Sequence, residues 1–538
     1  MKNKGKVYLV GAGPGSPDLI TLKGIRCLEQ AEAVIYDRLV NPRLLGYVPQ
    51  GAEIIYAGKS SHKHTIKQDE INRLLVKKAK QGKVVIRLKC GDPFLFARGA
   101  EEALFLAKHK ITFEVVPGVS SATAVPAYAG IPLTHRDYTS SVGIFTGHEQ
   151  PAKEGSHKPP RRRRGASRSH IYREKIARGL GTLVFLMGVE NLSRLVKNLL
   201  AAGRPKDTPC CLIQAGTYPE QKSLTADLAA ISEKAKRAGF RPPAILVVGE
   251  VVDLRKKINW FELKPLFGKR ILLTRPAFGM AEGENSLSEL LEGQGAFCVE
   301  FPVLAIKPLD DYRALDASIK QIMDFHWLIF TSQNGVKFFK QRLVHLRKDA
   351  RSLSGVKIAA IGPRTKMALE AIGLRADLEP AHYCQEGLIE CFKKIKIKGQ
   401  NILIIRALSA RDALPQGLEK MGARIKITPA YQASGPKPQA TSLRPQVLDV
   451  ITFTSSSSVR NFFQILSKKV FRRLTLPFLS SKNLSPVERA GLIKKPLLAS
   501  IGPITSGQLK RLGLKPDIEA KSYTFEGLTQ AIVQYYQR

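Results

Sequence analysis

Short apolar runs alternate with amphipathic segments along most of the chain. Several of the runs are uninterrupted stretches of Val, Ile and Leu, as in strands that are covered on both faces. Between them, segments such as Gln68–Lys80 place apolar residues at helical spacing. The alternation predicts an α/β fold. In the first half we expect strands at Val7–Val10, Ala33–Tyr36, Glu53–Tyr56, Val84–Leu88, Phe113–Val116, Val142–Thr146, Thr182–Leu186, Cys211–Gln214 and Ala244–Val248.

A second α/β series begins at Gly268, and it contains an internal repeat. The segment Thr331–Phe339 recurs as Thr454–Phe462, and Ala360–Thr365 recurs as Ser500–Thr505. A Gly-Leu pair and a Glu-Gly-Leu triplet then follow at equal offsets in both copies. Matched spacing over several motifs indicates a duplication, so we expect two similar lobes.

The length of the chain supports this division. At 538 residues it is too long for one core, since single cores rarely grow past roughly 250–300 residues. We expect a first enzyme at residues 1–252, a charged linker at 253–267 and a second enzyme at 268–538. The first apolar run is too short for a signal peptide, and no stretch approaches a membrane span.

Basic residues dominate the charge: 85 Lys and Arg stand against 45 Asp and Glu, a formal net charge of +40. A nucleic acid and a small polyanionic metabolite are both candidate partners for such a surface. The run at 158–164 is expected to be a solvated loop, with an anion contact as the alternative. The seven cysteines form no Cys-x-x-Cys pair, so we expect neither a metal site nor disulfides, and a cytoplasmic location.

Glycines and functional side chains follow successive strands of the first half. Gly11–Gly15, Asp37, Lys59, Cys90–Pro93 and Met187–Gly188 each come directly after a predicted strand. Ligands of open α/β sheets bind beyond the carboxyl ends of strands, where glycines allow close approach to the backbone. The glycine loop departs from Gly-x-Gly-x-x-Gly and its proline lacks an N–H, which disfavours a dinucleotide. A purely structural turn is the alternative interpretation of that loop.

Five motifs carry a resemblance to a known family over about residues 5–250. The segments Gly11–Gly24, Tyr36–Val40, Arg87–Glu102, Val116–Ser121 and Gly130–Arg136 resemble uroporphyrinogen-III C-methyltransferase. That family has a tetrapyrrole-methylase fold of two α/β lobes, binds S-adenosyl-L-methionine between them, and methylates uroporphyrinogen III twice to precorrin-2. The resemblance implies a homodimer through this half. It also implies a cofactor site made of Pro14, Gly91, Asp92, Leu95, Ser120, Ser121, Met187 and Gly216.

The same resemblance assigns roles in the reaction. Asp37 matches the family's proton acceptor and Lys59 its proton donor; a helix cap and a surface amine are the respective alternatives. Uroporphyrinogen carries eight carboxylates, for which we expect cationic clamps at Arg87, Lys89 and Arg98, with His135 and Arg136 nearby. The family usually has glycine where this chain has Cys90 and Ala97. If position 90 needs a positive φ, Cys90 would strain the loop.

After residue 268 the sequence shows no nucleophile–base pair, metal spacing or phosphate loop. An enzyme of this kind works by holding a reactive substrate in one shape. The segments Ile271–Pro276, Thr331–Val336, Ile361–Gly373, Thr454–Val459 and Ile501–Gly513 resemble uroporphyrinogen-III synthase. That family joins two lobes by a β-ribbon, and it closes hydroxymethylbilane into a macrocycle with ring D inverted, without a cofactor.

The second resemblance implies lobe one at 268–302 plus 433–538, lobe two at 305–430, and a ribbon of Phe301–Ile306 with Thr428–Gln432. Tyr431 matches the family's proposed proton donor, with a packing role as the alternative. Side chains expected to bind the substrate's carboxylates are Arg275, Thr331, Ser332, Asn334, Thr454 and Ser455, with Arg406 as a further candidate. As plain helix caps, the hydroxyl residues would look the same from sequence.

Together these features predict a bifunctional enzyme whose second half makes uroporphyrinogen III and whose first half methylates it. Two alternatives stay open: a methyltransferase of the same fold acting on a later corrinoid or on RNA, and a basic RNA-binding protein. We expect polyanionic tetrapyrroles as partners and no nucleic acid or membrane. No unassigned dinucleotide-binding unit is left for a dehydrogenase, so precorrin-2 is the expected end product, for either sirohaem or cobalamin.

Overall fold

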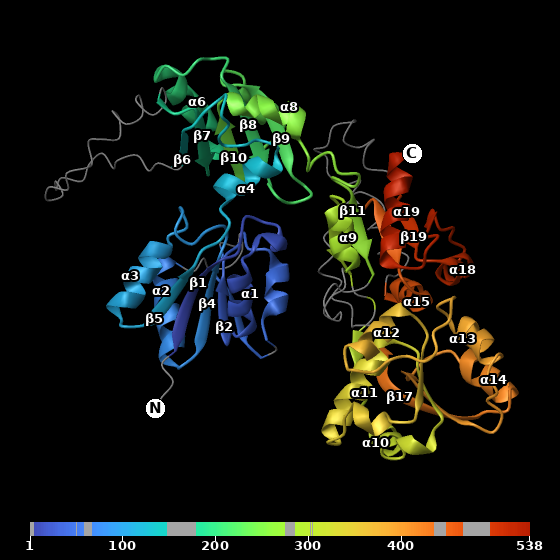
Figure 1. Ribbon diagram of the computed structural model, residues 1–538. Coiled ribbons are helices and arrows are strands. Elements are labelled where there is room, and N and C mark those ends of the chain that lie inside the picture. The colour runs from blue at the N-terminus through green and yellow to red at the C-terminus, as the bar shows by residue number, and fades with distance from the viewer. Residues whose placement is uncertain are drawn as a thin grey trace. The chain divides into compact units, whose positions relative to one another are not determined.

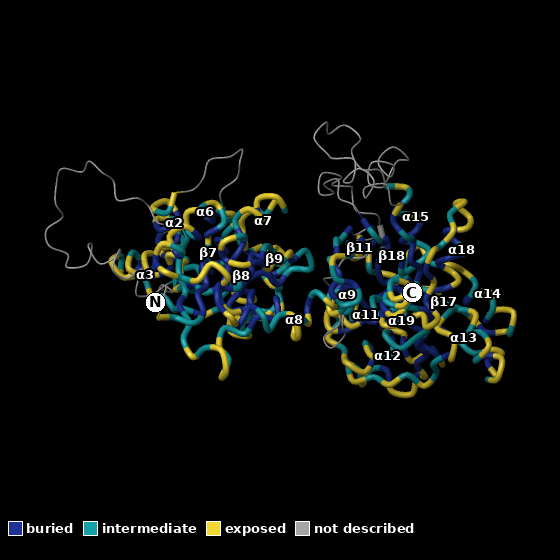
Figure 2. Tube along the Cα trace, turned by 90° about the horizontal axis from the view of Figure 1, so that it is seen from above, coloured by how far each residue is buried: buried dark blue, intermediate teal, exposed yellow. Residues whose placement is uncertain are grey.

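The computed structural model describes residues 5–49, 51–58, 67–147, 179–274, 286–301, 303, 305–434, 448–465 and 495–538. By its contacts the chain divides into two compact units. The first comprises Met1–Arg270 with Glu289–Cys298 and Val533–Arg538; the second comprises Ile271–Ser288 and Val299–Ile532. In both, buried strands are enclosed by helices and turns that carry the exposed residues (Figure 2).

The first sheet of the N-terminal unit is entirely parallel, with the order β3-β2-β4-β1-β5. Its strands are β1 (Lys6–Gly11), β2 (Ala33–Tyr36), β3 (Glu53–Tyr56), β4 (Val84–Lys89) and β5 (Thr112–Val116). One face is covered by α2 (Gln68–Lys80) and α3 (Gly99–Lys108), and the other by α1 (Leu22–Glu29) and the short helix η2 (Pro42–Tyr47) (Figure 1). Because all five strands are parallel, their carboxyl ends meet at one edge.

The second sheet of this unit is mixed, with the order β6-β7-β10-β8-β9. Its strands are β6 (Val142–Thr146), β7 (Thr182–Leu186), β8 (Pro209–Gln214), β9 (Lys222–Asp227) and β10 (Ala244–Val248). Helices α6 (Leu192–Ala201) and α7 (Ile231–Arg237) pack on one face, and α4 (Ser121–Tyr128) and η4 (Glu250–Leu254) on the other. The sequence did not predict β9, because this edge strand buries only Ala226 and has no apolar run.

Two further sheets form the C-terminal part, with the orders β12-β11-β18-β19-β20 and β13-β17-β16-β14-β15. The first contains β11 (Arg270–Leu273), β12 (Phe297–Glu300), β18 (Val450–Phe453), β19 (Leu497–Ser500) and β20 (Ile518–Glu519). The second contains β13 (Ala305–Lys307), β14 (Trp327–Phe330), β15 (Lys357–Ala360), β16 (Asn401–Ala407) and β17 (Arg424–Ser434). Their helices are α9 (Leu287–Gly293), α10 (Arg313–Lys320), α11 (Gln333–His345), α12 (Pro363–Glu370), α13 (Gln385–Phe392), α14 (Ala413–Lys420), α15 (Ser456–Ile465), α18 (Pro503–Arg511) and α19 (Phe525–Gln537).

The sequence repeat corresponds to a structural repeat. In each sheet a strand leads into a helix twice in succession, β14–α11 and β15–α12 in one and β18–α15 and β19–α18 in the other. Small details are repeated as well: the Asp377 carboxylate accepts from the N–H of Ile358 at 2.7 Å, and Asp517 accepts from Leu498 at 2.8 Å. The prediction of two similar α/β lobes is confirmed.

The β-ribbon is present, but its paired residues differ from those predicted. Residues 305–307 pair antiparallel with 432–434, whereas 424–431 of β17 pair with β16 inside the sheet of lobe two. The expected partner segment Thr428–Gln432 is therefore mostly a sheet strand. The reason is the length of β17, whose first part completes a sheet before its last residues form the ribbon.

The segment predicted as a linker packs within the first unit. It contains the end of η4 and the short helix α8 (Arg255–Ile258), and the side chains of Phe261 and Leu266 are buried. The indole N–H of Trp260 donates to the carbonyl of Ala127 at 2.9 Å. Residues 253–267 thus contribute to the fold of the first unit.

Two glycines of one lobe provide a matched test of the packing. A Cβ at Gly527 would overlap the carbonyl oxygen of Ser522, whereas a Cβ at Gly507, inside α18, would meet open space. We expect Gly527→Ala to destabilise the protein by about 1–3 kcal/mol through overpacking. Gly507→Ala should stabilise it by about 0.5–1 kcal/mol, because alanine loses less backbone entropy in a helix. Thermal unfolding measures both, and equal midpoints would contradict the packing described for Gly527.

Among the described residues, no helix combines the length and the apolarity needed to cross a bilayer. The basic run at 158–164, Lys59 and Arg275 lie outside the described residues. The seven cysteines, all within the described residues, are not in disulfides. Over the described part of the chain, no three His, Cys, Asp or Glu side chains are grouped so that they could hold a metal ion.

Candidate active sites

The loops that follow β1, β4 and β5 are in direct contact at the carboxyl edge of the first sheet. The N–H of Gly91 donates to the carbonyl of Gly13 at 2.7 Å, and the N–H of Ala12 donates to Lys89 at 2.7 Å. A Cβ at Gly118 would overlap the carbonyl of Gly91. Position 118 therefore accepts only glycine, because the two backbones themselves touch.

The next residues of these loops form a cradle in front of α4. Gly91 has φ +69°, and a Cβ there would meet only the backbone nitrogen of Ser121, at 3.8 Å. Ser120 caps the helix by accepting from the N–H of Ala122, and the Asp92 carboxylate accepts from Phe94 at 2.8 Å and from Gly118 at 3.0 Å. A glycine facing free space beside a helix N-terminus suits a polar, negatively charged part of a ligand.

The remaining predicted cofactor residues are Leu95, Gly216, Pro14 and Met187. Leu95 packs against the hydrophobic cluster that contains α4, and a Cβ at Gly216 would overlap Val125 of that helix. Both residues therefore lie against α4, the helix whose first turn borders the cradle. Pro14 is buried in the glycine loop. Met187 is 47% exposed with φ +55°, and its place in the site stays a prediction.

The anticipated strain at Cys90 is absent. The left-handed residues of this loop are Gly91, Phe96 and Arg98, and neither Cys90 nor Ala97 has a positive φ. Replacing the usual glycine by cysteine therefore costs no backbone strain at position 90. Burial raises the pKa of the Cys90 thiol to about 11, with a smaller contribution from the charge of Asp37, so the thiol is neutral at physiological pH.

A buried ion cluster holds Asp37. Arg87 Nη2 lies 2.5 Å from Asp37 Oδ1, and Arg87 Nε donates to Glu102 Oε1 at 3.0 Å. Lys89 Nζ lies 3.0 Å from the same Glu102 oxygen and 3.9 Å from Asp37 Oδ2. The side chains of Arg87, Lys89 and Glu102 are almost wholly buried, whereas that of Asp37 is 31% exposed. The cluster thus presents a single carboxylate toward solvent, at the carboxyl end of β2.

This geometry corrects the interpretation of Arg87 and Lys89. We predicted that both would clamp substrate carboxylates, but both are turned into the fold, against Glu102 and Asp37. Neither side chain is therefore at the surface, where a substrate carboxylate could reach it. Glu102 was not singled out in the sequence; the Glu-Glu pair at the start of α3 was the available signal, since one member faces outward and the other inward.

The cluster balances burial against charge. Burial opposes ionisation of Glu102, but the charges of Arg87 and Lys89 outweigh it and lower the pKa of Glu102. For Arg87, burial is likewise outweighed, by Glu102 and Asp37, and its pKa is raised. Burial and the charge of Arg87 together lower the pKa of Lys89. Within the cluster, Lys89 is therefore the cation that loses its proton most readily.

The other predicted clamps of this half are at the surface. Arg98 is exposed and pairs with Glu101 at 2.6 Å, His135 is partly exposed, and Arg136 is exposed. An exposed pair of this kind contributes only about 0–1 kcal/mol, so Arg98 is easily recruited by an anionic ligand.

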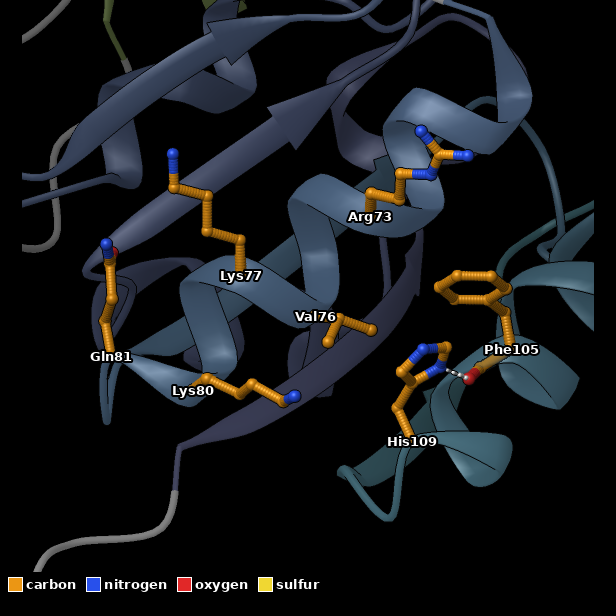
Figure 3. A pocket seen from close by; sticks show the side chains of 7 residues that line it. All are labelled: Arg73, Val76, Lys77, Lys80, Gln81, Phe105 and His109. Carbon is orange, nitrogen blue, oxygen red and sulfur yellow. Dashed lines mark hydrogen bonds between the residues drawn. The ribbon is translucent and has the colours of Figure 1, made fainter.

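A separate pocket of about 420 Å³ lies between α2 and α3 (Figure 3). It contains none of the predicted site residues, and it lies on the helical face rather than at the strand ends. Its lining residues are Arg73, Val76, Lys77, Lys80, Gln81, Phe105 and His109. His109 Nδ1 is fixed by the carbonyl of Phe105 at 2.8 Å.

In the second unit the structure brings together Tyr431 and Ser332. The tyrosine is 7% exposed, its hydroxyl lies 2.9 Å from Ser332 Oγ, and its ring stacks on Phe338. Ser332 also caps α11 by accepting from the N–H of Gly335 at 3.1 Å. Thr331 donates to the carbonyl of Ile405 at 3.3 Å, and Asn334 lies in the first turn of α11. Ser332 is thus a helix cap, as the alternative interpretation held. Its hydroxyl also contacts the hydroxyl of Tyr431.

The remaining predicted substrate-binding residues of the second unit that the structure describes are Arg406 and the turn that contains Thr454 and Ser455. Arg406, at the end of β16, is 9% exposed and pairs with Asp412 at 2.7 Å. The Ser455 Oγ accepts from the N–H of Ser458 at 3.0 Å, so this turn is the counterpart of the Ser332 cap. Thr454 is partly buried beside it. The hydroxyl turns thus follow equivalent strands, β14 and β18, in the two lobes.

Comparison with known proteins divides the chain in the same way. Residues 6–232 match the model of the tetrapyrrole (corrin/porphyrin) methylases, and residues 285–530 match that of uroporphyrinogen-III synthase HemD. The porphyrin biosynthesis protein HemD of Ruminiclostridium josui is 37% identical over 91% of this chain and 94% of its own length. The chain belongs to the tetrapyrrole methylases and the uroporphyrinogen-III synthases.

Relatives of the methylase half include proteins named as uroporphyrinogen-III methyltransferases. The S-adenosyl-L-methionine-dependent uroporphyrinogen III methyltransferase of Methanosarcina barkeri is 48% identical, over 47% of this chain and 94% of that protein. The crystal structure of uroporphyrin-III C-methyltransferase from Thermus thermophilus with S-adenosylhomocysteine covers 46% of this chain and 99% of that one, at 40% identity and a TM-score of 0.38. The two family models thus match successive, separate parts of the chain.

Proposed function

We propose that this chain catalyses two consecutive reactions of tetrapyrrole biosynthesis. The synthase half closes hydroxymethylbilane to uroporphyrinogen III, and the methylase half methylates that product twice with S-adenosyl-L-methionine, giving precorrin-2 for the sirohaem or cobalamin branch. The observation that carries the proposal is the partly exposed Asp37, held by a buried cationic cluster beside the cradle in front of α4. The names of the relatives of each half support it.

The methylase residues fit a cofactor with a carboxylate and a reactive methyl group. S-adenosyl-L-methionine supplies an electrophilic methyl when bound. Gly91, Asp92 and the start of α4 would hold the cofactor, because they combine free space with backbone donors. Asp37 accepts the proton that the macrocycle loses after a ring carbon has been methylated, and Arg87 fixes the direction of its carboxylate. Lys59 is proposed as the proton donor from the resemblance alone.

In the synthase half the proposed chemistry is proton donation to a leaving hydroxyl. The Tyr431 hydroxyl, 2.9 Å from Ser332 Oγ, gives its proton to the hydroxymethyl oxygen, which leaves as water. The N–H and hydroxyl groups of the turns at Ser332 and Ser455 bind carboxylates of the substrate. Arg275 is proposed as a further contact from the resemblance.

Replacing Tyr431 by phenylalanine tests that assignment. We expect the rate of ring closure to fall about 100-fold, because a positioned general acid contributes about 10²–10⁴-fold. The stacking on Phe338 is kept, so the fold should be unaffected. Tyr535→Phe, at an exposed position of α19, serves as the control and should leave the rate unchanged. A full rate in Tyr431→Phe would return Tyr431 to a packing role.

The whole proposal is tested by supplying hydroxymethylbilane and methyl-labelled S-adenosyl-L-methionine to the purified chain. We expect the type III isomer and a doubly labelled macrocycle. Formation of the type I isomer alone would remove the synthase assignment, and an unlabelled macrocycle would remove the methyltransferase assignment. Label on a later corrinoid or on RNA would favour the alternative methyltransferase functions.

We also propose that the methyltransferase half forms a homodimer, as the family resemblance implies. Light scattering should then give twice the 59.3 kDa of the chain. A mass of one chain at micromolar concentration would contradict this part of the proposal.

A further inference from the structure

The segment that leaves the methyltransferase half is hydrogen-bonded to one element of its predicted cofactor site directly and to a second through Gln221. We call Arg255–Glu262 the joining segment; it lies between the residues matched by the two family models, 6–232 and 285–530. Its anchor is Glu262, whose side chain is 16% exposed. One carboxylate oxygen accepts from Ser223 Oγ at 2.5 Å and from Gln221 Nε2 at 2.9 Å, and the other pairs with Arg255.

Gln221 carries the connection to the first element, the loop 215–217. Its side chain is buried, and its Oε1 accepts from the backbone N–H of Thr217 at 3.0 Å. Ala215 and Thr217 have φ values of +50° and +70°, which non-glycine residues keep only where the surroundings impose them. Thr217 Oγ1 in turn accepts from the N–H of Ser16, at the end of the glycine loop, at 3.1 Å. The loop that contains Gly216 is therefore held on one side by Gln221, whose amide is bonded to Glu262, and on the other side by the N–H of Ser16.

The second element is α4, whose carboxyl end is held by the same group of residues. The carbonyl of Ala127 accepts from Trp260 Nε1 at 2.9 Å, that of Tyr128 accepts from Gln221 Nε2 at 3.3 Å, and that of Ala129 accepts from Arg255. A guanidinium at this end also complements the helix dipole. The other end of α4 carries Ser120 and Ser121, next to Gly91. Both elements that adjoin the cradle are thus fixed from the joining segment.

We propose that Glu262 is a positioning residue for the cofactor of the methyltransferase half. The inference rests on the proposed use of S-adenosyl-L-methionine by this half. Without the carboxylate, the buried amide of Gln221 loses an acceptor and Arg255 loses its counter-charge. The loop 215–217 can then leave its left-handed backbone conformation. Part of the binding free energy of the cofactor is used to restore that conformation, so the affinity for the cofactor falls. Asp37 and its ion cluster make none of these contacts, so proton transfer is unaffected once the cofactor is bound.

The test compares three variants of the full-length chain by calorimetric titration with S-adenosylhomocysteine. Glu262→Ala should bind about tenfold more weakly, as expected for the loss of a charged hydrogen-bond acceptor. Glu262→Gln should stay within about threefold of the wild type, because its amide oxygen still accepts from Gln221 and Ser223. Asp253→Ala, which removes only the exposed pair with Lys256 next to the joining segment, should bind as the wild type does.

Two further readouts separate positioning from general loss of structure. In Glu262→Ala, kcat at saturating S-adenosyl-L-methionine and the KM for uroporphyrinogen III should stay within about twofold of wild type, while the Thr217 amide exchanges its hydrogen faster. An unchanged affinity in Glu262→Ala would overturn the inference, as would a parallel fall of kcat, both binding constants and the thermal midpoint. If the wild-type chain itself fails to bind S-adenosylhomocysteine, the proposed function falls, and this inference with it.

Discussion

Asp37→Asn is expected to lower the rate of methyl transfer by about 10²–10⁴-fold, the range that a general acid or base contributes. Asparagine keeps the size of the side chain and still accepts a hydrogen bond from Arg87, but it cannot take up a proton at neutral pH. Release of labelled product from methyl-labelled S-adenosyl-L-methionine and uroporphyrinogen III measures the rate. Binding of S-adenosylhomocysteine should be unchanged, because the cradle at Gly91 and Ser121 does not involve Asp37.

The chain contains its own control for this experiment. Ring closure by the synthase half of the same Asp37→Asn preparation should proceed at the wild-type rate, which excludes errors in concentration; unchanged binding of S-adenosylhomocysteine excludes misfolding of the methylase half. Full methylation by Asp37→Asn would show that Asp37 is only a partner of Arg87, and the proton acceptor would have to be sought elsewhere among the strand-end loops.

Glu102→Gln is expected to destabilise the first unit by about 3–5 kcal/mol, the cost of breaking a buried ion pair by removing one partner. The substitution leaves two buried cations, Arg87 and Lys89, with Asp37 as their remaining carboxylate. Hydrogen exchange in peptides from β1 and β4 reports the opening of this sheet separately from the synthase half. Methyl transfer should fall as well, because the neutral amide no longer balances the charges of Arg87 and Lys89, the two buried cations that contact Asp37.

The neighbouring glutamate is the matched control. Glu101 pairs with Arg98 at the surface, and Glu101→Gln should change stability by only about 0–1 kcal/mol. Similar losses in the two variants would mean that the buried cluster contributes no more than a surface pair.

The cluster also predicts a dependence on pH. Because the pKa of Glu102 is lowered in the folded protein, its stabilising contribution is complete above the ordinary glutamate pKa of about 4.3 and is lost as the pH falls through the lowered value. Between the ordinary and the lowered pKa of Glu102, the free energy of unfolding of the wild type should fall with acid more steeply than that of Glu102→Gln. The plots of this free energy against pH should therefore converge for the two proteins.

The sequence predicted strands most accurately where they are apolar and buried. β10 buries all five of its residues and was predicted with its observed bounds, whereas the edge strand β9 was missed because its exposed positions carry Lys222, Thr225 and Asp227. The duplication was also readable, since the Gly-Pro and Thr-Ser turns that mark it are needed at strand ends. The predicted position of the ribbon was wrong because sequence alone does not show where the long strand β17 stops pairing with β16 and begins to pair with β13.

For the candidate site, motif positions predicted which loops meet but not which way their charged side chains turn. Gly91, Asp92, Ser120 and Ser121 are together as expected. The direction of Arg87 and Lys89 was wrong because it depends on Glu102, a residue of α3 that reaches them only once the helix has packed on the sheet. The importance of residues 255–262 could not be predicted either, since their partners Gln221 and Ala127 are distant in sequence.

The sheet of lobe one joins parts of the chain that are synthesised far apart in time. β11 pairs in parallel with β18, and Thr274 Oγ1 donates to Thr452 across 178 positions of sequence. Lobe two is made entirely of residues that emerge between these strands. At translation rates of about 5–20 residues per second, β11 has no partner in β18 for roughly 10–35 s after it leaves the ribosome. The inserted lobe has that interval in which to fold first, while Ile271–Leu273 still lack their parallel partner strand.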